Sequence, residues 1–304
     1  MNPRASSPHT PDAAAGMSAG QPRNDRIPRR VWIGLVAIAV YVLVAVAGSN
    51  AVSAALPVGD PLIQFTLNEL ISLPILILAG LYFVRRSGWG RDVWRERPTL
   101  TMTPRRWWLV SIPVLFLLMQ LLRIPEVPWA TTPVTSLGLV VMAVFVVALG
   151  EELFFRGILL TSIRARHGEL VTMLTTSLLF GLAHIFGSLE EGVPVAVIAL
   201  QVMIISMTGT LFYWARRVTG TLWAPILLHF LDDYMGITSA GVSSAAQALT
   251  TDSSGSSDLV GGLQVILIIL SLCAIISAAR EDARTRRHAR EANSPASTHI
   301  PHKA

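Results

Sequence analysis

The sequence predicts an all-α membrane protein, a polytopic transmembrane helical bundle of about eight spans. Of its 304 residues 52% are hydrophobic and 14% charged, and the mean hydropathy is +0.55. Soluble globular domains carry roughly a quarter charged residues. Apolar stretches of membrane-crossing length recur along the chain, and basic and non-basic connections alternate between them. This combination is typical of a multi-pass protein.

Eight apolar stretches have the length of a membrane-crossing helix, which needs about 20 residues and ranges from roughly 17 to 25. They are residues 31–48, 62–84, 107–122, 134–162, 169–187, 193–215, 220–238 and 259–279. The third stretch is short and contains Pro113, which favours a kink. The fourth stretch is long and contains Glu151 and Glu152.

The distribution of arginine predicts how these spans are oriented. Connections after even-numbered spans are basic, whereas residues 49–61 and 239–258 contain no arginine or lysine. Because short cytoplasmic loops carry the excess of basic residues, we expect a multi-pass cell-membrane protein with both termini in the cytoplasm. A cleaved signal peptide over the first stretch is the alternative, which the length of that stretch and of its leader disfavours.

Ionisable side chains inside three spans are the strongest functional signal. An apolar run leads into Glu151 and Glu152, His184 closes a second run, and His229 lies with Asp233 in a third. An ionisable group inside a membrane span is costly and usually faces a polar interior, so each is a functional-site hypothesis.

The spacing within each span brings the polar groups to one helix face. Glu152 and Arg156 are four residues apart, as are His229 and Asp233, and residues at this spacing are neighbours on a helix. With a rise of about 1.5 Å per residue, the groups lie at similar depths, and His184 fits this layer least well. We therefore expect them to share one cavity.

These residues resemble the CAAX protease and bacteriocin-processing family, also called the type II CAAX prenyl endopeptidase or Abi family. The family pattern is EExxxR, FxxxH and HxxxN or HxxxD on separate transmembrane helices. This chain has Glu151-Glu152-xxx-Arg156, Phe180-xxx-His184 and His229-xxx-Asp233 in that order. The resemblance covers about residues 134 to 238.

The resemblance implies an intramembrane glutamate endopeptidase that needs no cofactor. By this resemblance Glu151 is the general base that activates water, assisted by His184. His229 and Asp233 stabilise the oxyanion, and Glu152 with Arg156 organises the site. The eukaryotic members have Asn at the last position, and an ionised Asp233 would repel an oxyanion. Asp233 is therefore protonated, orients His229 or serves another role.

Composition, the apolar spans and the resemblance together divide the chain into parts. We expect a disordered cytoplasmic tail over 1–30, N-terminal transmembrane helices over 31–130, a catalytic transmembrane core over 131–238, an extracytoplasmic loop over 239–258, a last transmembrane helix over 259–279 and a basic cytoplasmic tail over 280–304. The expected partners are the lipid bilayer and a membrane-associated peptide or protein substrate, with no nucleic acid. That substrate reaches the cavity from the bilayer or from its cytoplasmic face.

Three other readings of the same residues stay open. Buried Glu and His also build proton relays, so a proton-coupled transporter is the alternative from another class, and a non-catalytic membrane scaffold is the third. Zinc accepts the same nitrogen and oxygen ligands, although no HExxH segment is present.

Two further acidic residues of the spans are not assigned to the site. Asp232 is left outside it. Glu69 in the second span is interpreted as a polar packing contact, with a place in the same cavity as the alternative.

Overall fold

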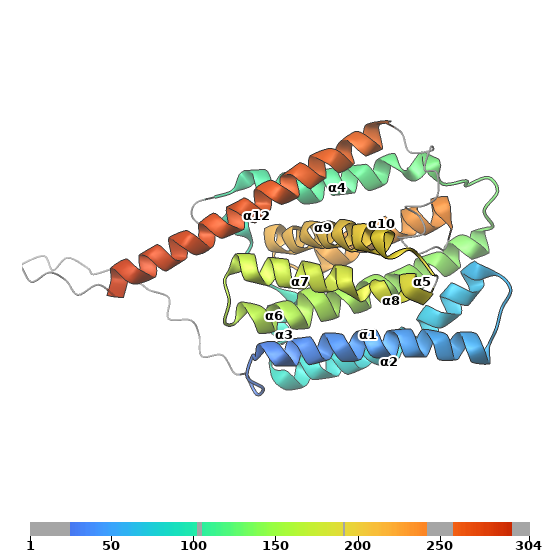
Figure 1. The fold of residues 1–304 in the computed structure, drawn as a ribbon, viewed down its shortest axis with the longest axis horizontal. Coiled ribbons are helices and arrows are strands. Elements are labelled where there is room, and N and C mark those ends of the chain that lie inside the picture. The colour runs from blue at the N-terminus through green and yellow to red at the C-terminus, as the bar shows by residue number, and fades with distance from the viewer. Residues whose placement is uncertain (1–24, 102–104, 191, 242–257, 294–304) are drawn as a thin grey trace, which may run out of the picture.

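The computed structural model describes residues 25–101, 105–190, 192–241 and 258–293, which form one bundle of helices running in both directions (Figure 1). No strand occurs within these described ranges, so the predicted all-α fold is confirmed. Helix α1 begins and helix α12 ends at the same end of the bundle (Figure 1).

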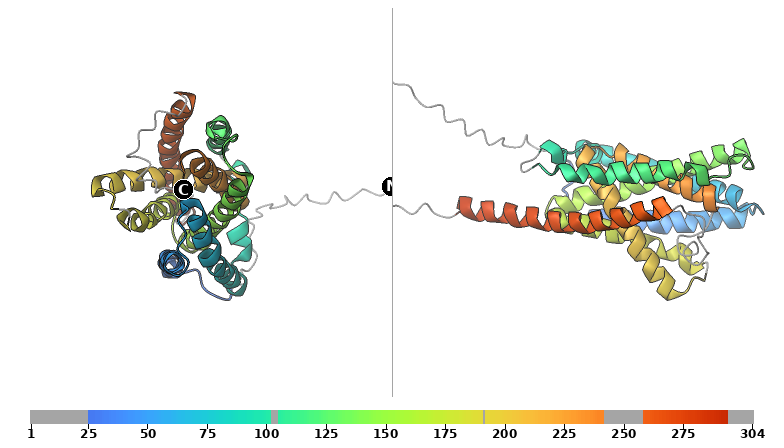
Figure 2. Two further views of the ribbon diagram at one scale, coloured as in Figure 1. Left: turned by 90° about the vertical axis from the view of Figure 1, so that its right-hand side faces the viewer. Right: turned by 90° about the horizontal axis from the view of Figure 1, so that it is seen from above.

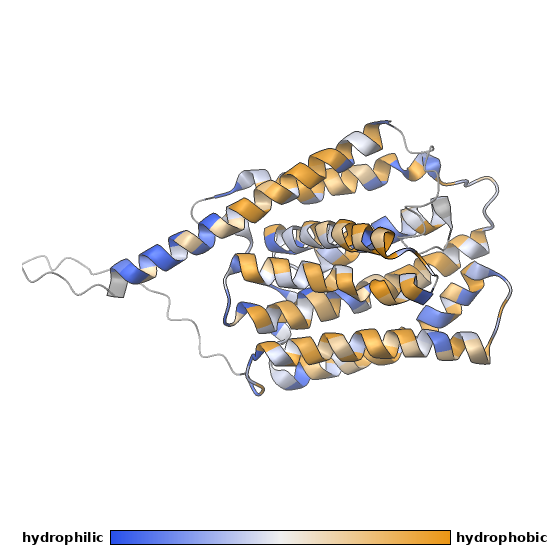
Figure 3. Cartoon of the chain, viewed as in Figure 1, coloured by the Kyte–Doolittle hydropathy of each residue, from blue (hydrophilic) through white to orange (hydrophobic). Residues whose placement is uncertain are grey.

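Seven helical stretches of the described residues are long and apolar enough to cross a membrane. They are formed by α1 (Val31–Ala55), α2 (Pro61–Ser87), η2 (Trp107–Val110) with α4 (Ser111–Leu122) and η3 (Ile124–Glu126), α5 (Val134–Glu152) to α6 (Leu160–Arg164), α7 (Glu169–Ala183) with α8 (Ile185–Glu190), α9 (Val195–Thr219) and α12 (Asp258–Asn293). Figure 3 shows the apolar colouring along these helices. The chain is a multi-pass membrane protein.

The eighth predicted span is α10 (Trp223–Ala240), which packs against α4, α5 and α9. It is not among the seven strongly apolar stretches, because it carries His229, Asp232 and Asp233. A membrane helix with such groups is stabilised when they face neighbouring helices. Its position inside the bundle meets this requirement.

The long fourth span contains a π-helical turn. Helix α5 ends at Glu152, residues Leu153–Leu159 form the π-helix η4, and α6 follows without a loop. All seven residues of η4 are buried. π-Helical turns are rare and occur often at functional sites, and this one begins directly after the two glutamates and contains Arg156.

The third span contains Pro113 in the first turn of α4, where the missing N–H of proline breaks no hydrogen bond within that helix. The span begins as the short 3₁₀ helix η2, and the kink stays a prediction.

The two predicted tails are partly ordered. Helix α12 continues without interruption to Asn293 and projects beyond the rest of the bundle (Figure 2), so the expected tail over 280–304 is helical in its first half. Before α1, Arg29 pairs with Asp25 at 2.8 Å and with Asp92 at 2.5 Å. Residues 1–24 and 294–304, and most of the predicted loop over 239–258, lie outside the described residues.

The two ends of the bundle differ in charge. We call the end at which α2, α6, α9 and α12 terminate the arginine-rich end. It carries Arg85, Arg86, Arg164, Arg216, Arg217, Arg280 and Arg284. We call the opposite end, where α1, α8 and α10 terminate, the arginine-poor end. The positive-inside rule predicts that the arginine-rich end faces the cytoplasm.

Residues 88–101, which include α3 (Gly90–Trp94) and η1 (Thr99–Thr101), fold across the arginine-rich end. The backbone N–H of Glu96 donates to the Gly220 carbonyl at 2.9 Å, and the N–H of Leu222 donates to the Trp94 carbonyl at 3.1 Å. The Trp94 and Trp223 rings stack at 5.6 Å. This segment therefore ties the start of α10 to the end of α2.

Candidate active site

Glu151 and Glu152 occupy the last turn of α5 and point in different directions, because successive residues are rotated by about 100° on a helix. The side chain of Glu152 is fully buried, whereas that of Glu151 is 18% exposed. The consecutive carboxylates therefore have different environments, one inside the packed bundle and one beside a cavity.

The buried Glu152 pairs with Arg156 inside the bundle. The guanidinium Nη1 of Arg156 donates to Glu152 Oε1 at 2.8 Å, and Nη2 donates to the Gly209 carbonyl at 3.1 Å. The guanidinium also lies 4.0 Å from the centroid of the Phe180 ring, within the range of a cation–π contact. Glu152 and Arg156 are both fully buried, so each neutralises a charge that the low-dielectric interior would otherwise disfavour.

This arrangement requires close approach between α7 and α9. A Cβ atom added to Gly209 would lie 3.0 Å from Arg156 Nη2, and one added to Gly181 would lie 2.3 Å from Ser206 Oγ. Glycine at these two positions lets the helices approach and leaves the Gly209 carbonyl accessible to the arginine.

His229 joins α10 to both glutamates. Its Nδ1 lies 3.1 Å from Glu152 Oε1, and its Nε2 lies 3.3 Å from Asp233 Oδ2 and 3.8 Å from Glu151 Oε2. The imidazole stacks on the Phe212 ring at 4.8 Å. The His229 ring is thus held in one orientation by carboxylates at its edge and an aromatic ring on its face.

His184 occupies the one-residue break between α7 and α8. Its Nδ1 lies 2.8 Å from the Phe180 carbonyl oxygen. Because a carbonyl only accepts hydrogen bonds, Nδ1 carries the proton and Nε2 is left for other partners. The break aims this ring at the cavity that Glu151 also lines.

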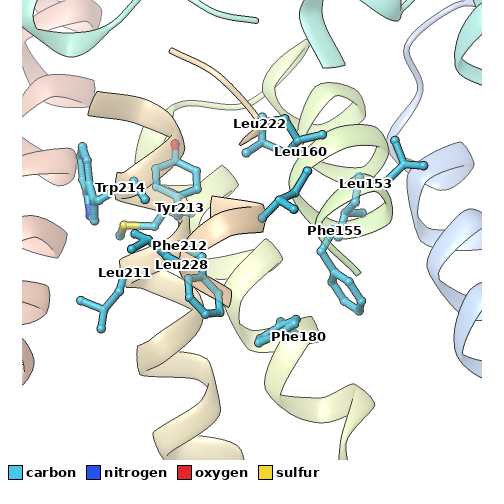
Figure 4. Close-up of a cluster of buried hydrophobic side chains, with 14 of the residues drawn as sticks. Leu153, Phe155, Leu160, Phe180, Leu211, Phe212, Tyr213, Trp214, Leu222 and Leu228 are labelled. Carbon is cyan, nitrogen blue, oxygen red and sulfur yellow. The ribbon is translucent and has the colours of Figure 1, made fainter. Parts of the chain in front are cut away.

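Aromatic rings surround the polar groups. Phe180 packs edge-on against Phe155 at 5.3 Å, against His184 at 5.1 Å and against His229 at 5.6 Å. Figure 4 shows Phe155, Phe180 and Phe212 close together among the buried side chains. Phe180 therefore contacts both histidines and Arg156.

A cavity of about 310 Å³, which we call the central cavity, lies beside Glu151 and His184. Its lining includes Tyr41, Asn50, Glu69, Phe155 and Glu190. Glu69 therefore lines the same cavity as Glu151, which was the alternative to a polar packing contact. Oε2 of Glu151 is buried and accepts no hydrogen bond from the described residues.

The central cavity opens toward the arginine-poor end. The lining residues Asn50, Gly187 and Glu190 are exposed, whereas Tyr41 and Phe155 are buried. The amide of Asn50 donates to Glu190 Oε1 at 2.9 Å, which joins α1 to α8 across the mouth. The exposed lining residues therefore lie where α1 and α8 terminate, and access from the bilayer or from its cytoplasmic face stays a prediction.

The structure brings most of the predicted site residues together. Glu151, Glu152, Arg156 and His229 form one contact network, and His184 shares the central cavity with Glu151. Asp233 contacts His229, but its side chain is 34% exposed and it does not line that cavity.

Three neighbours of the site were not predicted from the sequence. Tyr41 carries a hydroxyl within an apolar first span, which was a usable signal. Phe212 and Gly209 gave no signal in the sequence, because an aromatic residue and a glycine are ordinary in a membrane helix. Asp232 lies outside the site as expected, since it accepts a hydrogen bond from Gln120 at 2.9 Å.

Within the described part of the chain, no group of three or more His, Cys, Asp or Glu side chains is arranged to hold a metal ion. His229 has three carboxylates around it, but its ring nitrogens face their oxygens directly. Of these contacts, the one between Nδ1 and Glu152 Oε1 is a hydrogen bond.

A multi-pass helical bundle with paired glutamates and two histidines at an internal cavity defines an intramembrane polar site. Residues 132–235 match the family model described as type II CAAX prenyl endopeptidase Rce1-like. The match covers about a third of the chain and includes all six predicted site residues. Neither a curated protein nor a solved structure matches the chain.

The resemblance to the CAAX protease family is thereby confirmed over these residues. Over these residues the chain is similar to CAAX-type intramembrane proteases.

Proposed function

We propose that this protein is an endopeptidase of membrane-associated proteins or peptides in which Glu151 activates the attacking water. The observation that carries the proposal is the placement of Glu151. Its Oε2 is buried without a hydrogen bond from the described residues, and its carboxylate lines a cavity shared with His184. A water-activating base needs free acceptor capacity within hydrogen-bond reach of the water.

The proposed reaction begins with water held between Glu151 and Nε2 of His184. Glu151 takes one proton as the water oxygen bonds to the scissile carbonyl carbon, which produces a tetrahedral oxyanion. A proton on Nε2 of His229, which faces Glu151, stabilises that oxyanion as a preorganised donor. The C–N bond then breaks, and Glu151 gives its proton to the leaving amine.

The remaining residues position these groups. Glu152 accepts from Nδ1 of His229 and from Arg156, which fixes the histidine ring. Asp233 Oδ2 lies 3.3 Å from the same Nε2, so in this proposal it orients the His229 ring before the substrate binds, and the Nε2 proton then turns to the oxyanion. Among the roles left open by the sequence for Asp233, this geometry supports orientation.

We propose that the substrate segment enters the central cavity from the arginine-poor end. The exposed mouth residues are at that end, and the 88–101 segment covers the other. If the positive-inside rule holds for this chain, the substrate is an extracytoplasmic or membrane-embedded segment. The proposed location is the cell membrane, with both termini in the cytoplasm.

A cleavage assay tests the protease against the alternatives. Purified protein is incubated with a pooled library of quenched membrane peptides, with and without a chelator. We expect cleavage that the chelator does not change. Cleavage lost to the chelator and restored by zinc would make the site a metalloprotease instead. Peptide-free proteoliposomes that show Glu151-dependent solute uptake would favour the transporter.

A further inference from the structure

A second polar cavity lies at the arginine-rich end, far in the sequence from the central cavity. Its volume is about 610 Å³, and it is formed between residues 105–108 and helix α12. The lining combines cationic and apolar side chains, including Arg105, Arg106, Trp108, Cys273, Arg280 and Arg284. We call it the basic cavity.

Contacts on both sides hold α12 at this position. Arg106 donates to Ser277 Oγ at 2.9 Å and also pairs with Glu281. The next residue, Asp282, accepts from the backbone N–H groups of Glu169 at 2.7 Å and Leu170 at 3.1 Å. The basic cavity is therefore bounded by a helix that is docked to two other parts of the bundle.

Three of the four arginines in this lining are not neutralised by any described residue. The lining contains four arginines and one carboxylate, Glu281, which is already paired with Arg106. Arg105, Arg280 and Arg284 make no ion pair or hydrogen bond with any described residue. Unpaired guanidinium groups that converge on one cavity favour an anionic ligand, and the guanidinium fork matches phosphate geometry.

Arginines beside membrane spans also set topology, and that role alone requires no convergence on a cavity. Arg286 and Arg287 lie on the same helix but do not line the basic cavity. The convergence of Arg105 with Arg280 and Arg284, from segments about 175 residues apart, is thus an additional feature of the fold.

We propose that the basic cavity binds the phosphate headgroup of an anionic phospholipid from the leaflet at the arginine-rich end. A free phosphate shares this chemistry, but the apolar part of the lining favours a lipid. Trp108 and Ile276 are 38% and 53% exposed, and interfacial tryptophan lies at headgroup level. Basic pockets between membrane helices on this side of a bilayer bind anionic headgroups.

Native mass spectrometry of the full-length protein in detergent tests this site with phosphatidylglycerol and phosphatidylcholine as probes. We expect selective retention of phosphatidylglycerol by the unmodified chain. The double variant Arg280→Gln/Arg284→Gln should bind it about 30-fold more weakly, because each arginine near an anionic lipid contributes about a fivefold change in affinity. The matched control Arg286→Gln/Arg287→Gln removes the same charge and should change the affinity less than about threefold.

Three outcomes would overturn the proposal. Equal losses in the two double variants would show a diffuse surface-charge effect. Equal binding of the two lipids would show no anion preference. Displacement of phosphatidylglycerol by millimolar inorganic phosphate would assign the cavity to free phosphate.

A second readout needs no substitution at an arginine. Cys273 is the only cysteine of the chain and lines the basic cavity. We expect phosphatidylglycerol, but not phosphatidylcholine, to slow its reaction with a maleimide severalfold. An unchanged rate under conditions where mass spectrometry shows bound lipid would place that lipid elsewhere.

Discussion

Glu151 and Glu152 are consecutive residues, but their side chains lie in different environments. Glu152 is fully buried between Arg156 and His229, and Glu151 beside it lines a cavity. The sequence indicates both residues, because two carboxylates at the end of an apolar run are conspicuous. Which of them faces the cavity depends on the packing of neighbouring helices, and only the resemblance to a family suggested the answer in advance.

Substitutions of Asp233 test whether His229 needs an acceptor oxygen at this position. Asp233→Asn keeps a side-chain oxygen for His229, and we expect it to retain activity within about tenfold. Asp233→Ala leaves the ring free to move and should lower kcat by about 100-fold, since small misplacements of a catalytic group have effects of this size. Steady-state cleavage rates provide the measurement.

The adjacent Asp232 is a matched control for this comparison, because its side chain bonds to Gln120 and Arg123 and forms no hydrogen bond with His229. Asp232→Ala should cleave at close to the unmodified rate. If Asp233→Asn were as inactive as Asp233→Ala, the carboxylate charge itself would be required, and the orienting role would be wrong.

At the scale of elements, the periodicity of apolar residues predicts the helices but not their irregularities. The fourth span reads as one apolar helix, yet Leu153–Leu159 form a π-turn. The fifth span breaks at His184 although no proline or glycine occupies that position. Both irregularities depend on tertiary contacts, such as those around Arg156 and Phe180, which a local pattern does not contain.

Gly220 ends α9 with a φ of 73°, a conformation that costs other residues about 1–2 kcal/mol. A Cβ there would also lie 2.5 Å from the Glu96 carbonyl oxygen in the 88–101 segment. We therefore expect Gly220→Ala to lower the free energy of unfolding by more than about 2 kcal/mol. Unfolding in mixed micelles measures the change.

Gly192 has a similar φ of 71°, but an added Cβ there would meet nothing within 4 Å. Gly192→Ala therefore isolates the backbone contribution and should have the smaller effect. Equal effects of the two substitutions would mean that the close approach of the added Cβ to the Glu96 carbonyl costs no stability.

At the scale of the whole molecule, the sequence predicts the number of spans and the charge difference between the two ends. It does not predict which end the central cavity faces. The direction of the cavity depends on how α1 and α8 are arranged at the mouth and on how the 88–101 segment covers the other end. These are long-range contacts between segments such as Asn50 and Glu190, which are 140 residues apart.

Cysteine accessibility tests the direction of the cavity. In a chain carrying Cys273→Ser, Gly187→Cys places a thiol at the mouth, where added atoms meet nothing within 4 Å. Arg91→Cys places one on the exposed surface of α3. We expect an impermeant maleimide to label Gly187→Cys in intact cells and Arg91→Cys only after permeabilisation. The reverse pattern would place the mouth in the cytoplasm.

The most direct test of the whole account compares two Glu→Gln substitutions in the same cavity. Glu151→Gln removes the proposed base, whereas Glu69→Gln changes another carboxylate that lines the same space. On one cleaved peptide, we predict that Glu151→Gln lowers kcat by about 10²–10⁴-fold, the usual contribution of general-base catalysis. Glu69→Gln should remain within about threefold of the unmodified chain, and both variants should stay folded. Near-normal turnover by Glu151→Gln would contradict the central claim that this glutamate activates the water.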